Sequence, residues 1–374
     1  MRRLWFSGVA VATLAFVATP AIAQVHLSAL LSMVARNHDA RFQSNNTNFG
    51  ITPFDAVYGR VFIDAAISER LSAFMQWFAH DYDGAFLYGA YVRYDHTPGM
   101  HLEAGLIPVP VGLWPPRTYA DKNPLVSVPA IYQYKTSLDG FGALQTTDEE
   151  ILGQRGLAKN APVLYDFCWN TGIHAYASRG QFDFGIALLN GSLGMPKREF
   201  VYSRPTGAIH VNWIPSPYAT IGGWVAAGPW MSPGFEPALP FGKKVEDYNQ
   251  LTAGALVQAS AGHAELNAEF VLNRYEHPYL GNLESVGGYA DLKYSFATRW
   301  WAAARFDALS FSELDTDNAT GEKWDYPLAR IEAGLGRRLS ERALIKLVTQ
   351  IVRYSDAPKA LDGETFALQF TVEL

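Results

Sequence analysis

The chain has 374 residues and a formal net charge of −6, and it is 49% hydrophobic, 14% aromatic and 18% charged. A mean hydropathy of −0.03 excludes a bundle of membrane-spanning helices, which needs repeated apolar runs of about 20 residues. The acidic balance argues against non-specific nucleic-acid binding, and the single cysteine, Cys168, excludes a disulfide scaffold and a multi-cysteine metal site.

The first residues follow the order of a secretory signal peptide. Arg2 and Arg3 precede an apolar stretch over residues 9–17, and a small-residue A-x-A sequence ends at Ala23. This pattern predicts that residues 1–23 direct export and are removed after Ala23. The alternative interpretation, an N-terminal membrane anchor, is disfavoured because the apolar stretch is short.

From Gln24 onward, apolar and polar residues alternate with period two, which indicates strands that have one apolar and one polar face. In the last segment, for example, Phe366, Leu368 and Phe370 alternate with Thr365 and Gln369. About sixteen strands are predicted, near residues 25–36, 54–67, 70–80, 86–95, 101–107, 172–179, 181–190, 206–214, 218–228, 250–261, 263–274, 286–296, 299–311, 326–338, 343–355 and 364–374.

The connections between these strands alternate in length. The short ones cover residues 68–69, 96–100, 180, 215–217, 262, 297–298 and 339–342, and the long ones cover residues 37–53, 81–85, 108–171, 191–205, 229–249, 275–285, 312–325 and 356–363. Long connections on one rim and tight turns on the other are typical of an outer-membrane barrel. The predicted fold is therefore all-β, a transmembrane antiparallel barrel over residues 24–374. The strands of a secreted β-sandwich also alternate apolar and polar residues, but a sandwich gives no reason for long and short connections to alternate.

The inward face of such a barrel is predicted to be charged and wet. A barrel of about sixteen strands is too wide for its inward side chains to fill. Burying many charges in a dry core would cost several kcal/mol each, whereas a water-filled lumen avoids that cost. By parity the pore wall includes Arg60, Asp64, Arg93, Glu103, Glu265, Glu269, Asp291, Lys293, Arg305, Asp307, Arg330 and Glu332.

The third long connection, residues 108–171, is the longest of them. It contains five prolines between Pro108 and Pro124, interleaved with aromatic residues such as Trp114 and Tyr132. Loops of this length are usually functional or disordered, and proline lowers the entropy lost on ordering. We expect the loop to fold into the barrel and narrow the pore. The candidate constriction residues are Arg117, Asp121, Lys122, Lys135 and Arg155, although each could be an ordinary exposed charge.

The export signal, the alternating strands and the Phe/Val/Leu-rich final strand resemble those of Gram-negative general porins. The segment HLEAGLIPVPVGLWPPRTYADKNPLV, residues 101–126, is similar to the third-loop region of the phosphate-selective porin O and P type. The resemblance implies a homotrimer in the bacterial outer membrane, in contact with its lipid and lipopolysaccharide, that passes ions and small hydrophilic solutes. Two features depart from it. The chain ends in Leu374 where porins usually place Phe, and the mixed inward charges do not form the arginine ladder that phosphate selectivity needs.

Other functional classes stay open. A barrel protease would use Asp and His at the rim, such as those of the His80–Asp83 stretch, and a barrel lipase would need a serine paired with a histidine, for which the sequence offers no convincing spacing. A surface adhesin would bind through a long loop such as 229–249. Asp315, Asp317 and Asn318 could hold Ca²⁺ or form a solvated loop tip. The sequence predicts no catalytic residue, cofactor or metal site, and it contains no Gly-rich phosphate loop followed by a helix.

Overall fold

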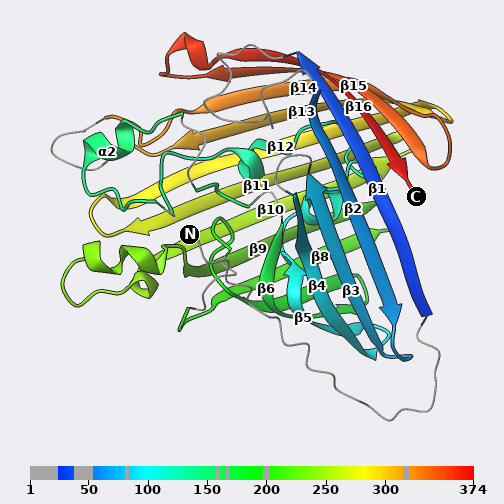
Figure 1. Ribbon diagram of the computed structural model, residues 1–374, viewed down its shortest axis with the longest axis horizontal. Helices are drawn as coiled ribbons and strands as arrows, with labels where there is room; N and C mark the ends of the chain where they lie inside the picture. The colour runs from blue at the N-terminus through cyan, green and yellow to red at the C-terminus, as the bar shows by residue number, and fades with distance from the viewer. Residues whose placement is uncertain are drawn as a thin grey trace, which may run out of the picture.

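The computed structural model describes residues 24–37, 54–80, 84–140, 142–156, 161–165, 168–196, 202–314 and 321–374. Sixteen strands form one closed antiparallel barrel in which each strand pairs with its neighbours in sequence (Figure 1). The first and last strands complete the ring through pairs that run from Leu30 and Glu373 to Asn37 and Phe366. Closure gives every strand two partners, so the sheet has no free edge.

The strands are β1 Gln24–Asn37, β2 Phe54–Ala66, β3 Leu71–His80, β4 Gly84–Thr97, β5 Met100–Pro108, β6 Trp169–Arg179, β7 Phe182–Leu189, β8 Thr206–Ser216, β9 Ala219–Pro229, β10 Asn249–Ala261, β11 Ala264–His277, β12 Gly281–Ala297, β13 Trp300–Phe311, β14 Leu328–Arg338, β15 Ala343–Tyr354 and β16 Gly363–Glu373. The helical turns are η2 Pro115–Arg117, α1 Ala130–Gln133, α2 Asp148–Leu152, η3 Pro233–Ala238, η4 Val245–Asp247 and η5 Lys359–Leu361. None of the helices in the described ranges is long and apolar enough to cross a bilayer.

The predicted barrel, its strand count and its inward-folded third loop are confirmed, and most strand ends agree within a few residues. One connection was predicted wrongly. The segment 275–285 is not a long loop, because β11 and β12 continue to the pair His277–Gly281 and leave only a three-residue turn. Gly281 has φ +72°, which suits a tight turn. The predicted signal peptide, Asp81–Asp83 of the rim cluster, and Asp315, Asp317 and Asn318 lie outside the described residues.

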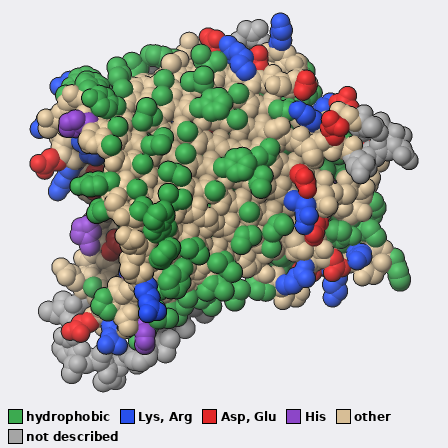
Figure 2. All heavy atoms as spheres, turned by 180° about the vertical axis from the view of Figure 1, so that it is seen from behind, with side chains coloured by type: hydrophobic (Ala, Val, Ile, Leu, Met, Phe, Trp, Pro, Cys, Tyr) green, Lys and Arg blue, Asp and Glu red, His purple; other side chains and the backbone are tan. Residues whose placement is uncertain are grey.

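The two faces of the sheet differ in polarity as predicted. On β13 and β14 the outward side chains of Phe306, Ile331 and Leu335 are each about half exposed, whereas the inward Arg305 and Arg330 are almost fully buried. Figure 2 shows apolar side chains across the middle of the outer surface, with charged side chains gathered toward its two ends. This distribution suits a wall that meets hydrocarbon along its middle and water at both rims.

The outer face supports a test of its contact with lipid. Ile331 lies near the middle of β14, with Phe306 and Ile351 beside it on the neighbouring strands. We expect Ile331→Arg to lower the free energy of unfolding in lipid vesicles by about 2–4 kcal/mol, because the guanidinium would enter the hydrocarbon. The control is Glu341→Arg in the exposed turn after β14, which should change the free energy of unfolding by less than about 0.5 kcal/mol. Equal effects in the two variants would contradict a lipid-facing wall.

Candidate functional site

The connection between β5 and β6 covers residues 109–168, and its described part builds an apolar core inside the barrel. Its side chains Trp114, Tyr132 and Tyr134 are almost fully buried, and they belong to one cluster with inward residues of β7 through β14. Part of the lumen is therefore filled by protein. The sequence predicted that the loop enters the barrel, but it assigned the charged wall residues to a water-filled lumen.

Local sequence fixes the turns of this loop. Pro115 and Pro116 start η2, where the fixed φ of proline suits a first helical turn and its missing N–H costs nothing. Pro129 precedes α1 in the extended conformation. Farther along, Thr147 and Glu150 form a capping box at the start of α2. Local sequence therefore determines several individual turns of the loop.

Arg305 on β13 is the first of several buried wall charges that hold the loop. Its guanidinium pairs with Asp291 on β12 and donates to the carbonyl oxygen of Ser127 at 2.7 Å. A further donor reaches Oδ1 of Asn123 at 3.2 Å. Asp291 is shared, because Arg117 of the loop lies 2.7 Å from its other oxygen. The loop is therefore tied to β12 and β13 by charged hydrogen bonds, which are stronger than neutral ones.

Lys346 on β15 binds the loop through its main chain. The ammonium donates to the carbonyl oxygens of Ala120, Asn123 and Leu125 at 2.7, 2.8 and 2.8 Å. An ammonium has three donors, and all three are used. The lysine is almost fully buried, so these three bonds replace its hydration.

The next wall residues bind the loop in the same way. Glu332 on β14 accepts hydrogen bonds from the backbone N–H and the hydroxyl of Ser127. Asp307 on β13 accepts from the N–H of Ala130 at 2.7 Å and pairs with Arg330 at 2.9 Å. Each of these carboxylates is almost completely buried. Their partners are loop atoms and neighbouring charges, so they do not line open water.

Glu269 on β11 holds an earlier part of the loop. It accepts from the N–H of Leu113 at 3.3 Å and from the hydroxyl of Tyr132 at 3.0 and 3.1 Å. Burial, reinforced by this carboxylate, raises the pKa of Tyr132 well above its usual range, so the phenol keeps its proton as a donor. Together, β11 to β15 form an anchoring wall.

Tyr119 extends the loop to the opposite wall. Its hydroxyl donates to Oε1 of Gln76 on β3 at 3.0 Å, and burial raises its pKa to about 12. The guanidinium of Arg60 on β2 lies 5.0 Å from the Tyr119 ring and 4.8–5.0 Å from the rings of Phe78 and Tyr88. Arg60, predicted as a pore-wall residue, is thus enclosed by aromatic rings.

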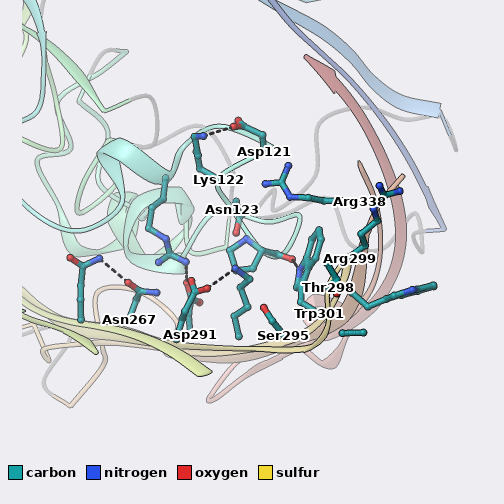
Figure 3. Close-up of a pocket in the computed structure, with 17 residues that line it drawn as sticks. Asp121, Lys122, Asn123, Asn267, Asp291, Ser295, Thr298, Arg299, Trp301 and Arg338 are labelled. Carbon is teal, nitrogen blue, oxygen red and sulfur yellow. Dashed lines mark hydrogen bonds and ion pairs between the residues drawn. The ribbon is translucent and has the colours of Figure 1, made fainter. Parts of the chain in front are cut away.

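Three of the five candidate constriction residues come together at the end of the lumen nearest the short turns. Arg117, Asp121 and Lys122 line a cavity of about 290 Å³ with residues of β10 to β14 (Figure 3). Asp121 and Lys122 pair with each other at 2.9 Å, and the Lys122 side chain is 63% exposed. The cavity is also lined by Glu265, Asp291, Lys293, Arg299 and Arg338. It therefore carries five basic and three acidic groups.

The other two candidates lie elsewhere. Arg155 pairs with Glu322 at 3.0 Å and stacks on Tyr326, both in the long connection between β13 and β14. That connection is at the rim opposite the short turns. Lys135 lies over the ring of Tyr165, 5.4 Å from its centroid. The structure does not bring these two residues to the cavity that holds Arg117.

The remaining predicted wall residues have mixed surroundings. Asp64 and Arg93 line a second cavity, about 410 Å³, on the inner side of β1 to β4. Glu265 and Lys293 pair at 2.7 Å at the rim of the first cavity. Glu103 is buried and accepts from the hydroxyl of Tyr176 at 2.9 Å. Open space in the lumen is therefore lined by only part of the predicted set.

Asp325, which lies in the connection before β14, is an anchor that the sequence analysis missed. It accepts from the hydroxyl of Tyr134 at 3.0 Å and from the N–H of Ser137 at 2.7 Å. Burial raises its pKa to about 7, although these donors act in the opposite direction. No periodic signal extends into a connection, so nothing in the sequence marked this residue.

No family model matches the chain, and no curated protein does either. Similar solved structures are outer-membrane proteins. They include an anion-selective porin from Comamonas acidovorans (TM-score 0.60, 10% identity, 94% of this chain and 99% of that one). OmpF of Salmonella typhi in complex with daunomycin gives a TM-score of 0.59 at 11% identity, with coverage of 94% and 97%. OmpT of Vibrio cholerae in its trimer form gives 0.58 at 8%, with coverage of 94% and 99%. At these identities the likeness shows a shared fold, that of the porin barrels.

The three bonds of Lys346 predict that this residue keeps the loop in place. We expect Lys346→Met to lower the local stability of residues 120–125 by about 2–3 kcal/mol, because three buried carbonyls lose a charged donor. Hydrogen exchange of the Asn123 and Leu125 amides should accelerate accordingly. Lys293→Met, which removes only a partly exposed ion pair, should change exchange there by less than about 1 kcal/mol. Unchanged exchange in Lys346→Met would contradict the anchoring role.

The raised pKa of Asp325 predicts a pH-dependent stability. An ordinary carboxyl ionises near pH 4, whereas this one ionises near pH 7 in the folded protein. The stabilisation that this carboxyl gives the folded protein is therefore fully present below about pH 4, declines as the pH rises, and is lost above about pH 7. We expect Asp325→Asn to flatten the decline of the free energy of unfolding between these limits. Urea titrations in micelles at several pH values measure the free energy of unfolding. If its slope against pH is the same in Asp325→Asn as in the wild type, the prediction is contradicted.

Proposed function

We propose that the protein is an outer-membrane porin, a channel for passive diffusion of ions and small hydrophilic solutes. The observation that carries the proposal is the closed sixteen-strand barrel, apolar outside, with a 60-residue connection anchored across its lumen. A loop that enters the lumen narrows the pore of such a wide barrel without blocking it. No chemical step is part of this function, and no enzyme activity is proposed.

The constriction is proposed to lie where the loop meets the cavity near the short turns. Arg117, Asp121 and Lys122 present charges there, and the wall supplies Lys293 and Arg338. All three acidic groups of this cavity are paired, since Asp291 binds two arginines, Glu265 binds Lys293 and Asp121 binds Lys122. The surplus of basic groups favours anions over cations at this point. Lys135 and Arg155 are proposed to act at the opposite mouth, where the long connections lie.

The surroundings of the protein are proposed by analogy with its structural neighbours. One of them, OmpT of Vibrio cholerae, is described as a trimer, and another is described as an anion-selective porin. We propose a homotrimer in the bacterial outer membrane, exported by residues 1–23 and surrounded by lipid and lipopolysaccharide. Phosphate selectivity is not proposed, because the buried arginines Arg305 and Arg330 bind the loop and carboxylates.

Conductance in planar bilayers tests the proposal. The refolded protein should give stepwise, near-ohmic currents, and unheated gel electrophoresis should show a trimer. A silent bilayer together with cleavage of peptides or lipids would instead favour a barrel enzyme. For a surface adhesin, deletion of residues 229–249 would abolish partner binding, whereas a porin lacking them would still conduct.

The exposed ammonium of Lys122 predicts a measurable effect on selectivity. A unit charge about 8 Å from the ion path contributes about 0.5 kcal/mol in water, so charge reversal changes the barrier by up to about 1 kcal/mol. Because reversal raises the barrier for anions and lowers it for cations, each by up to that amount, Lys122→Glu should lower the anion-to-cation permeability ratio by up to roughly thirtyfold. Lys243→Glu, in the connection between β9 and β10, should leave the ratio unchanged because it lies at the other rim. If Lys122→Glu leaves the ratio unchanged, Lys122 does not line the ion path.

A further inference from the structure

Two histidine side chains meet on the inner wall, away from the constriction. His174 lies on β6 and His210 on β8, and the strand between them presents Gly185, which pairs directly with His210. The centroids of the two imidazole rings are 5.4 Å apart, and the ring planes are inclined by 60°. Their neighbours Ile173 and Ile209 are half exposed on the outer face, so the imidazoles lie on the lumen side.

Gly185 leaves the space into which both rings reach. A Cβ atom built at this position would lie 2.7 Å from Nε2 of His174 and 3.0 Å from Nε2 of His210. Both nitrogens therefore approach the same point above the middle strand. Any other residue at position 185 would have to push the rings away, so glycine is needed for this arrangement.

Each imidazole also has an acceptor near its ring. Nδ1 of His174 lies 3.9 Å from Oε2 of Glu103, and Tyr176 holds that carboxylate through its other oxygen. A hydrogen bond joins the His210 ring to the backbone of Pro110 in the loop. A carboxylate or carbonyl behind an imidazole orients the ring and leaves its other nitrogen with a lone pair. Histidine ligands of metal ions are usually supported in this way.

The nitrogen of His174 that faces Gly185 lacks a partner. His174 is 7% exposed, and its Nε2 atom is buried without a hydrogen bond from any described residue. Buried polar atoms are nearly always paired, so such an atom indicates a position for a water molecule, an ion or a ligand. A metal ion placed between the rings would satisfy the lone pairs of both histidines at once.

We propose that His174 and His210 bind one divalent transition-metal ion of the zinc, copper or nickel class. Imidazole nitrogen suits these metals, whereas Ca²⁺ and Mg²⁺ prefer oxygen ligands. Within the described ranges no group of three or more His, Cys, Asp or Glu side chains is arranged for a metal. Water therefore completes the coordination. The proposal goes beyond the channel function and does not depend on it.

Calorimetric titration of the refolded, untagged protein with ZnCl₂ tests the site. We expect one Zn²⁺ per chain in the wild type. Loss of a residue that only supports a metal ligand weakens binding by roughly 10–100-fold. His174→Gln and His210→Gln remove the ligands themselves, so each should weaken Zn²⁺ binding by more than this. Glu103→Gln removes only such a supporting residue and should weaken binding by about tenfold. His263→Gln, in the turn between β10 and β11, is the matched control and should bind like the wild type.

Gly185→Ala gives a second, independent test, because it keeps both histidines and fills the space between them. It should lose Zn²⁺ binding like the histidine variants, while heat-modifiable mobility on gels reports that the barrel has folded. Zn²⁺ binding that persists in the His174→Gln/His210→Gln double variant would overturn the proposal, as would absence of binding to the wild type.

Electron paramagnetic resonance with Cu²⁺ identifies the ligands directly, through coupling of the unpaired electron to their nitrogen nuclei. The wild type bound to one Cu²⁺ should show coupling to two nitrogen nuclei, and each single histidine variant should show coupling to one. A wild-type spectrum without nitrogen coupling would overturn the proposal. Both measurements report metal binding even if the protein forms no conducting channel.

Discussion

Closure of the backbone hydrogen-bond ladder is the constraint on which this structure depends. In hydrocarbon an unpaired N–H or C=O group costs several kcal/mol, so a sheet can cross the bilayer only as a ring. Here the ring closes through β1 and β16, and apolar side chains of the strands point to the outside of the ring. Every second residue must then face inward, which places charged side chains in a confined interior. The third loop lies among these charges.

The inward charges and the loop satisfy each other. A buried ion loses its hydration, which is repaid only when enough hydrogen bonds replace it. Lys346 finds three loop carbonyls, and Glu332 finds the amide and hydroxyl of Ser127. Conversely, the loop has main-chain groups inside the barrel that need partners away from water. The charged wall from β11 to β15 thus fixes the position of the loop, as well as contributing to the surface of the lumen.

The sequence predicted the parts of the molecule that repeat. Period-two alternation located the sixteen strands and assigned Arg305 and Glu332 to the inner face, because side-chain direction in a strand follows from parity. Parity could not show what those side chains touch. It assigns both Lys293 and Arg330 to the inner face, although Lys293 lines an open cavity and Arg330 is buried beneath the loop. Within the loop no period exists, so the separation of Arg155 from Arg117 and the role of Asp325 depend on tertiary contacts alone. The β11–β12 hairpin extends farther than predicted for a related reason, because the outward residues at its tip, such as Glu276, Asn282 and Glu284, are polar.

The wall holds the loop chiefly by its main chain. The carbonyls of Ala120, Asn123 and Leu125 and the amides of Val126 and Ala130 are the groups that β13, β14 and β15 grip. A peptide group is the same whatever side chain it carries. Many side chains along this stretch can therefore be exchanged in evolution while the scaffold continues to hold the loop backbone at the same height and angle.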